Sequence, residues 1–252
     1  MAGHSKWANR VHRKSRQDAK RGKLFGKLSK EIIVSARLGG GDPDINSRLR
    51  IAIQSARDVS MPSDNIERAI KRGSGDDDAE AYEEINYEGY GPGGAAMLLE
   101  CMTDNRTRTV AEVRKLFDKS GGNLGDGGSV AWMFEQKGVL VINKAGGVDG
   151  DQLFMAAVEG GAEDVVEDED EGYFEVTCEP SEFSNVRDAL TEAGHEFARA
   201  ELTYVPTSTT PVPDDKAKQL LNLVEALDDH DDVQKVHSNF EVSDEVLASL
   251  EA

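Results

Sequence analysis

Cysteine and long apolar runs are scarce in this 252-residue chain, and each shortage excludes a class of protein. Cys101 and Cys178, its two cysteines, are far apart and each lies in a short apolar run. This arrangement argues against a disulfide framework and for a reducing compartment. No apolar stretch approaches the roughly 20 residues that cross a bilayer, and the N-terminus lacks the apolar middle of a secretory signal. We therefore expect a cytoplasmic protein that contacts no membrane.

Motifs for catalysis, metals and cofactors are also lacking. No glycine-rich loop ends in the Gly-Lys-Ser/Thr of a P-loop, and the glycines at 91–94 precede a strand where a dinucleotide fingerprint precedes a helix. The five histidines show no metal-site spacing with the cysteines. We predict no enzyme, no metal and no cofactor. A small hydrolase stays an alternative, because catalytic groups can meet in space from distant positions.

Charge is present in excess and unevenly distributed. The net charge of −19 by itself disfavours a nucleic-acid partner. Residues 1–72, however, hold 17 Lys and Arg against 7 Asp and Glu, whereas residues 73–252 hold 12 against 41. Such an asymmetry indicates a contact surface for nucleic acid or membrane in the basic part.

The basic part has helical periodicity. Apolar residues recur at three- and four-residue spacing over 15–38, and Gly39 to Gly41 end the run. A second helix is predicted with Asp42 as its cap and Pro43 in its first turn, ending before Pro62. A third runs from Ser63 to Gly73. Residues 1–72 therefore form a basic helical domain, followed by a glycine-rich acidic linker.

The remainder alternates strands and helices. A hairpin is predicted over 82–102, a helix opened by a capping box at Thr109, and a strand over 129–135. Residues 121–128 are predicted to be a mobile connection. Segment 137–204 has the βαββαβ order of a ferredoxin-like domain, inserted into a discontinuous α+β domain made of 81–136 and 205–252. The predicted class is α+β and multidomain: an N-terminal three-helix domain followed by two ferredoxin-like α+β domains.

A dense row of cations near the N-terminus is the main candidate site. It comprises Lys6, Arg10, Arg13, Lys14, Arg16, Lys20, Arg21, Lys23, Lys27 and Lys30. This density is what neutralising a phosphate backbone requires, and Trp7 among these cations could stack on a base. The alternatives are a solvated polar face and a basic module that docks on the protein's own acidic body.

A second candidate is the polar loop 103–109. Arg106 and Arg108 lie where a helix N-terminus presents free N–H groups, which together would form a phosphate cradle. Ordinary capping, with salt bridges to Asp104 or Glu112, explains the same residues equally well. The acidic run 228–232 is most simply a charged helix end, with mimicry of an acidic partner as the lesser alternative.

Several motifs resemble the YebC/PmpR family, which includes a mitochondrial translational activator. They are 1–9 (MAGHSKWAN), 25–28 (FGKL), 61–66 (MPSDNI), 87–94 (YEGYGPGG) and 103–109 (TDNRTRT). The chain departs mildly from the family at Val11-His12, where Ile-Lys is usual, and at Thr107, where Asn is usual.

The resemblance implies three domains and a role in gene expression. Bacterial members are described as DNA-binding transcriptional regulators, and others resemble ribosome-associated translation factors. The expected partners are therefore DNA, ribosomal RNA or the ribosome, with a monomer favoured over an oligomer. A scaffold whose acidic surface binds a basic protein is a further alternative.

Overall fold

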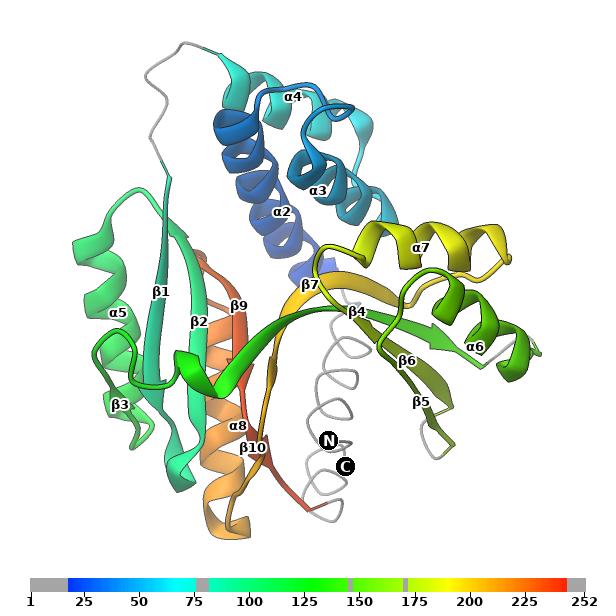
Figure 1. Ribbon diagram of the computed structural model, residues 1–252. Helices are drawn as coiled ribbons and strands as arrows, with labels where there is room; N and C mark the ends of the chain where they lie inside the picture. Colours follow the sequence, from blue (N-terminus) through cyan, green and yellow to red (C-terminus); the bar gives the residue numbers. More distant parts are fainter. Residues whose placement is uncertain (1–17, 76–81, 145–146, 170–171, 244–252) are drawn as a thin grey trace. The chain divides into compact units, whose positions relative to one another are not determined.

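The computed structural model describes residues 18–75, 82–144, 147–169 and 172–243, with side chains from residue 22 onward (Figure 1). These residues belong to two compact units. One unit comprises Met1–Met133 and Pro206–Ala252, and the other, the inserted unit, comprises Phe134–Val205. The first unit contains separate apolar cores in its helices and at its sheet, and the inserted unit has a core of its own.

The first described elements form a helical bundle: α2 (Asp18–Gly39), α3 (Ser47–Asp58) and α4 (Ser63–Ser74). Its core is built from positions of the predicted apolar faces, such as Ile32, Leu49 and Ile66. α2 and α4 approach closely at Gly73, where a Cβ atom would lie 2.3 Å from the carbonyl oxygen of Ile33. Only glycine fits this crossing without displacement of the backbone.

The start of α3 differs from the prediction. Asn46, not Asp42, is the N-cap, and its side-chain oxygen accepts a hydrogen bond from the Leu49 N–H at 3.1 Å. Its amide nitrogen donates to the carbonyls of Ser35 and Gly40, both at 2.8 Å. Asn46 therefore caps one helix and fastens the end of another. Asp42 instead closes a turn by accepting the N–H of Asp44.

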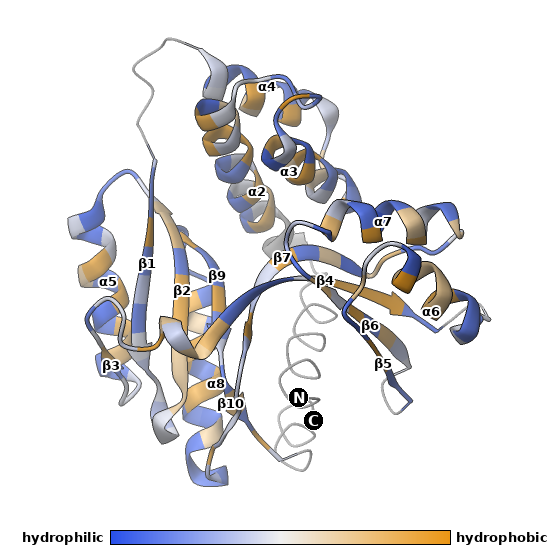
Figure 2. Cartoon of the chain, in the orientation of Figure 1, coloured by the Kyte–Doolittle hydropathy of each residue, from blue (hydrophilic) through white to orange (hydrophobic). Residues whose placement is uncertain are grey.

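The same unit contains a four-stranded sheet, the first sheet, in the order β3-β1-β2-β9. β1 (Glu83–Tyr90) and β2 (Ala96–Thr103) form an antiparallel hairpin across the short turn η1 (Pro92–Gly94). β3 (Asn123–Leu124) pairs with β1, and β9 (Val233–Ser238) pairs antiparallel with β2. Figure 2 shows β2 coloured mostly as hydrophobic, in keeping with its burial at the centre of the sheet.

Two helices pack on one face of this sheet. α5 (Arg106–Lys119) and α8 (Asp214–Asp228) contribute Val113, Phe117, Leu220 and Leu223 to a core shared with the strands. The remaining elements are the short helix η2 (Ala131–Met133) and a parallel pair, β8 (Thr210–Pro211) with β10 (Phe240–Glu241).

The glycine-rich loop between β3 and η2 is fastened by Glu88 of β1. The Glu88 carboxylate accepts hydrogen bonds from the N–H groups of Gly128, Val130 and Ala131 at 2.7, 2.7 and 2.8 Å. Burial alone raises the pKa of Glu88, but these three N–H donors outweigh it and lower the pKa. The loop 121–128, predicted to be a mobile connection, is thus fastened at Gly128 by a distant carboxylate that local sequence does not reveal.

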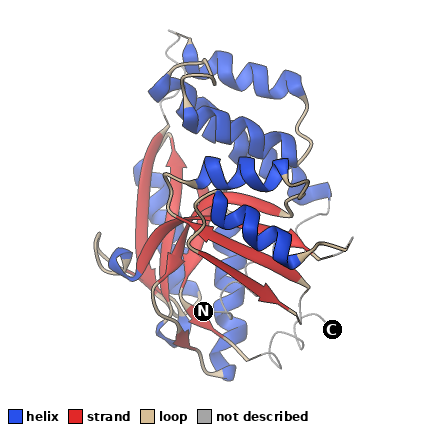
Figure 3. Cartoon of the chain, turned by 45° about the vertical axis from the view of Figure 1, so that its right-hand side comes forward, coloured by secondary structure: helices blue, strands red, loops and turns tan. Residues whose placement is uncertain are grey.

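The inserted unit has the ferredoxin-like order β4 (Phe134–Asn143), α6 (Gly150–Glu159), β5 (Asp164–Asp168), β6 (Tyr173–Cys178), α7 (Phe183–Glu192) and β7 (Arg199–Pro206). Its sheet has the order β5-β6-β4-β7. Figure 3 shows α6 and α7 together on one face of this sheet. The strand predicted at 129–135 is instead η2 followed by the beginning of the long strand β4. The predicted class, α+β with N-terminal helices followed by sheet-and-helix domains, is confirmed.

Candidate nucleic-acid interface

Most of the predicted N-terminal cations precede the side chains that the structure describes. Lys6, Trp7, Arg10, Arg13, Lys14 and Arg16 lie outside the described residues. Lys20 and Arg21 belong to the first turn of α2 by their backbone, but their side chains also lie outside the description. What the structure adds therefore concerns the later cations and the loop before α5.

Lys23, Lys27 and Lys30, here called the lysine row, project from one side of α2 toward residues 228–232, the acidic segment that begins at the last residue of α8. The Lys23 ammonium lies 3.2 Å from the Asp229 carboxylate, and that of Lys27 lies 2.9 Å from the Asp228 carboxylate. Lys30 donates to Asp232 Oδ1 at 3.0 Å and to the Asp231 carbonyl at 2.8 Å. The lysine row thus binds oxygens of the protein itself. This agrees with the alternative that the basic module docks on the protein's own acidic body.

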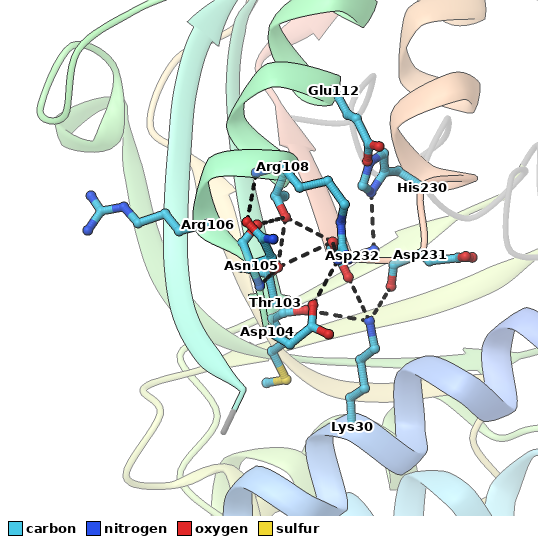
Figure 4. Close-up of polar contacts among 12 residues, drawn as sticks. Lys30, Thr103, Asp104, Asn105, Arg106, Arg108, Glu112, His230, Asp231 and Asp232 are labelled. Carbon is cyan, nitrogen blue, oxygen red and sulfur yellow. Dashed lines mark hydrogen bonds and ion pairs between the residues drawn. The ribbon is translucent and has the colours of Figure 1, made fainter. Parts of the chain in front are cut away.

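Asp232 is the centre of a buried polar cluster (Figure 4). Its Oδ2 accepts hydrogen bonds from Arg108 Nη2 at 2.6 Å and from the Thr109 hydroxyl at 2.8 Å. Burial alone raises the pKa of Asp232, but the donors Arg108, Lys30 and Thr109 outweigh burial and lower the pKa to about 2. Asp232 therefore stays ionised at neutral pH and ties α2, α5 and the end of α8 together.

The loop before α5 is organised differently from its predicted capping box. The helix begins at Arg106, four residues before the predicted start, and Asn105 is its N-cap, accepting the Arg108 N–H at 3.0 Å. The Thr109 hydroxyl does not cap: it donates into the Asp232 cluster. The side chain of Glu112, expected to complete the box, lies 2.9 Å from Nε2 of His230.

The two arginines of this loop have different surroundings. Arg108 forms ion pairs with Asp104 at 2.9 Å and with Asp232 at 2.6 Å, which matches the salt-bridge alternative to a phosphate cradle. Arg106 points away from the cluster in Figure 4 and is exposed. Within the described residues its guanidinium forms no ion pair. Of the two, Arg106 alone presents an uncompensated charge next to the helix N-terminus.

A cleft of about 850 Å³ lies between α2 and the acidic segment. Its lining includes Lys27, Tyr82, Arg108, Glu112 and His230. The Lys30 ammonium lies 5.3 Å from the centre of the Tyr82 ring, a cation–π distance. The cleft thus combines charges of both signs with one aromatic ring, which suits ionic recognition. In the described part of the chain, no group of three or more His, Cys, Asp and Glu is placed to hold a metal ion.

Exposed cations on the bundle were not singled out from the sequence. Arg57 lies in the last turn of α3, and Lys71 and Arg72 lie in the last turn of α4. All three are exposed, and none forms an ion pair with another described residue. Their signal was available in the sequence, since Arg68, Lys71 and Arg72 recur at the three- and four-residue spacing of one helix face. From the sequence we selected the denser N-terminal cluster instead of these residues.

Comparison with known proteins covers nearly the whole chain. Residues 5–76 match the family model described as the TACO1/YebC protein N-terminal domain, and residues 82–240 match the one described as the TACO1/YebC second and third domain. A protein of Dictyoglomus turgidum is 54% identical over 250 residues, covering 99% of this chain and 100% of that protein. One from Persephonella marina is 52% identical with the same coverage. Both are named "Probable transcriptional regulatory protein".

A solved structure gives the same picture of the fold. The crystal structure of a conserved hypothetical protein from Aquifex aeolicus is 44% identical to this chain and superposes with a TM-score of 0.83. The match covers 91% of this chain and 94% of that protein. No helix among the described residues is long and apolar enough to span a membrane.

Proposed function

This chain belongs to the TACO1/YebC family, and from that premise we propose that it regulates gene expression by binding nucleic acid, without catalysing a reaction. The relatives named as transcriptional regulatory proteins favour DNA as the polymer and transcription as the regulated step. The site of action would be the cytoplasm. The contact surface would be the basic side of the helical bundle, with Arg106 as an additional phosphate contact.

The observation that carries this proposal is that every ammonium group of the lysine row binds an anionic oxygen. Its ammonium groups recur every three or four residues on α2 and reach carboxylate oxygens at 2.9 to 3.2 Å. Phosphate oxygens accept hydrogen bonds from ammonium groups in the same way. The row continues a cationic sequence that begins at Lys6, so the N-terminal part of the chain would offer successive contacts to a polyanion.

Two further features support binding over catalysis. Both cysteines are buried, and burial raises the pKa of Cys101 to about 12 and that of Cys178 to about 11, so neither thiol is ionised at neutral pH. The cleft beside the lysine row is lined by paired charges, whereas a nucleophile needs an adjacent base that activates it.

Titration of a DNA duplex and of a ribosomal RNA fragment at several salt concentrations tests the proposal. Backbone binding predicts that log affinity falls linearly with log salt, by about 0.9 per phosphate contact on duplex DNA and about 0.7 on single strands. K20E/R21E should weaken binding on all sequences about equally, because phosphate contacts carry no sequence information. These two residues are preferred because Lys23 is engaged by Asp229.

The matched control is K216E/K218E, which produces the same change in net charge on two exposed lysines of α8. Its affinity should stay close to that of the wild type. Binding to RNA alone would move the proposed role from transcription to translation. Salt-independent binding, or no binding to either polymer, would overturn the proposal.

A further inference from the structure

The acidic segment 228–232 occupies the lysine row in the manner of a short polyanion. Each ammonium of the row has at least two oxygen partners, one from a carboxylate and one from the main chain. Lys27, for example, lies 2.9 Å from Asp228 Oδ1 and 2.7 Å from the Asp228 carbonyl oxygen. An ammonium has three N–H donors, so little capacity remains for a phosphate while these bonds persist.

The carboxylates that contact the lysine row differ in how far they are buried. The Asp232 side chain is 6% exposed and is also held by Arg108 and Thr109, so its bond to Lys30 belongs to a buried cluster. The side chains of Asp228 and Asp229 are 55% and 52% exposed. Exposed ion pairs are weak and are screened by salt. The Lys23 side chain is 45% exposed and that of Lys27 is 14% exposed, so the exposed carboxylates of Asp228 and Asp229 are the groups that can move away, whereas the buried Asp232 keeps Lys30 anchored.

We propose that Asp228 and Asp229 form an intramolecular phosphate mimic that competes with nucleic acid for Lys23 and Lys27. The inference rests on the proposed function and concerns the regulation of that same surface. A polymer with several phosphates displaces both carboxylates, whereas an isolated anion binds too weakly to do so. The exchange reduces non-specific affinity, since each ion pair formed with the polymer replaces an ion pair already present inside the protein.

The decisive variant is D228N/D229N, in which both side chains keep their size and lose their charge. We expect its affinity for duplex DNA to rise about three- to tenfold at low salt, and the increase to vanish at high salt. The fold should persist, because acidic residues at the C-terminus of α8 oppose the helix dipole. Thermal unfolding of the variant checks this directly.

Two controls separate a local competition from a general effect of charge. D214N/D215N makes the same charge change at the other end of α8 and should raise affinity less than twofold. K23Q/K27Q should abolish the increase. The variant that combines D228N/D229N with K23Q/K27Q should therefore bind with the same affinity as K23Q/K27Q alone.

An equal increase in D214N/D215N, or an increase that persists without the two lysines, would overturn the inference and leave nucleic-acid binding intact. Failure of every variant and of the wild type to bind DNA or RNA would overturn the proposed function as well.

Discussion

At the scale of single residues, Asp232 shows how burial changes the meaning of a charged side chain. Its neighbour Asp231 is exposed, whereas Asp232 is 4% exposed and accepts hydrogen bonds from side chains of α2, β2 and α5. In the sequence the two are equivalent members of one acidic run. No local pattern distinguishes them, because the partners Lys30, Thr103 and Arg108 come from distant positions.

Replacement of Asp232 by Asn should therefore destabilise the protein. The substitution removes the charge that compensates Arg108 and Lys30, and hydrogen bonds to charged groups contribute about 1.5–3 kcal/mol. We expect a loss in the free energy of unfolding of about that size, measured by urea denaturation. D231N removes the same charge from an exposed side chain and should change stability by less than about 0.5 kcal/mol. Equal effects of the two substitutions would contradict the role given to Asp232.

The same carboxylate predicts a pH dependence. Its pKa is about 2 in the folded protein against an ordinary value of 3.8, so the folded state favours the ionised form. This contribution is complete above about pH 5 and is lost as the pH falls through 3.8 toward 2, since the unfolded chain then binds the proton first. The stability difference between the wild type and D232N should shrink over this range. A constant difference from pH 6 to pH 2 would contradict the assignment.

At the scale of elements, the sequence located most helices and strands but misplaced two helix starts. Apolar periodicity is a local property, so it identified α2, α4 and the hairpin of β1 and β2. The N-caps depend on tertiary contacts. Asp42 with Pro43 is locally as good a start as Asn46, and Asn46 prevails because its side chain also reaches two carbonyls at the end of α2. Thr109 fits a capping box, yet its hydroxyl is used by Asp232.

The crossing of α2 and α4 gives a prediction at this scale. G73A should lower the free energy of unfolding by about 1–3 kcal/mol, because the new methyl group would meet the Ile33 carbonyl oxygen at 2.3 Å and the Ala36 side chain at 2.8 Å. The matched control is G26A in α2, where a Cβ atom meets nothing within 4 Å beyond its chain neighbours and the backbone of its own helix. There alanine should stabilise by up to about 1 kcal/mol, since it favours helix over the unfolded chain. Thermal denaturation distinguishes the two signs.

At the scale of the whole molecule, residue counts showed that residues 1–72 are basic and residues 73–252 acidic. They did not show which cations pair with which carboxylates. The bundle is basic and the rest acidic, yet Lys23, Lys27, Lys30 and Arg108 are each matched to a carboxylate. Which cations stay free depends on the path of the chain after α8. The sequence therefore identifies a candidate polyanion surface and cannot tell which of its members are available.

Separate cores predict separate losses of protection in hydrogen exchange. L153A truncates a fully buried side chain of α6 and should cost about 2–5 kcal/mol, accelerating exchange in the inserted unit. Amides of β1 and β2 should keep their rates. L99A, at an equally buried position of β2, should have the reciprocal effect. Uniform acceleration by both variants throughout the chain would show that the two cores open together.

The polypeptide leaves the first unit after Met133 and returns to it at Pro206, and these two positions lie close together. The N–H and hydroxyl of Thr207 both donate to the Met133 carbonyl, at 2.9 and 3.1 Å, and the flanking strands β4 and β7 are neighbours in their sheet. A few residues would therefore bridge the gap if the segment between them were removed. In evolutionary terms, the module could be acquired, lost or exchanged by one genetic event without rethreading the polypeptide around it.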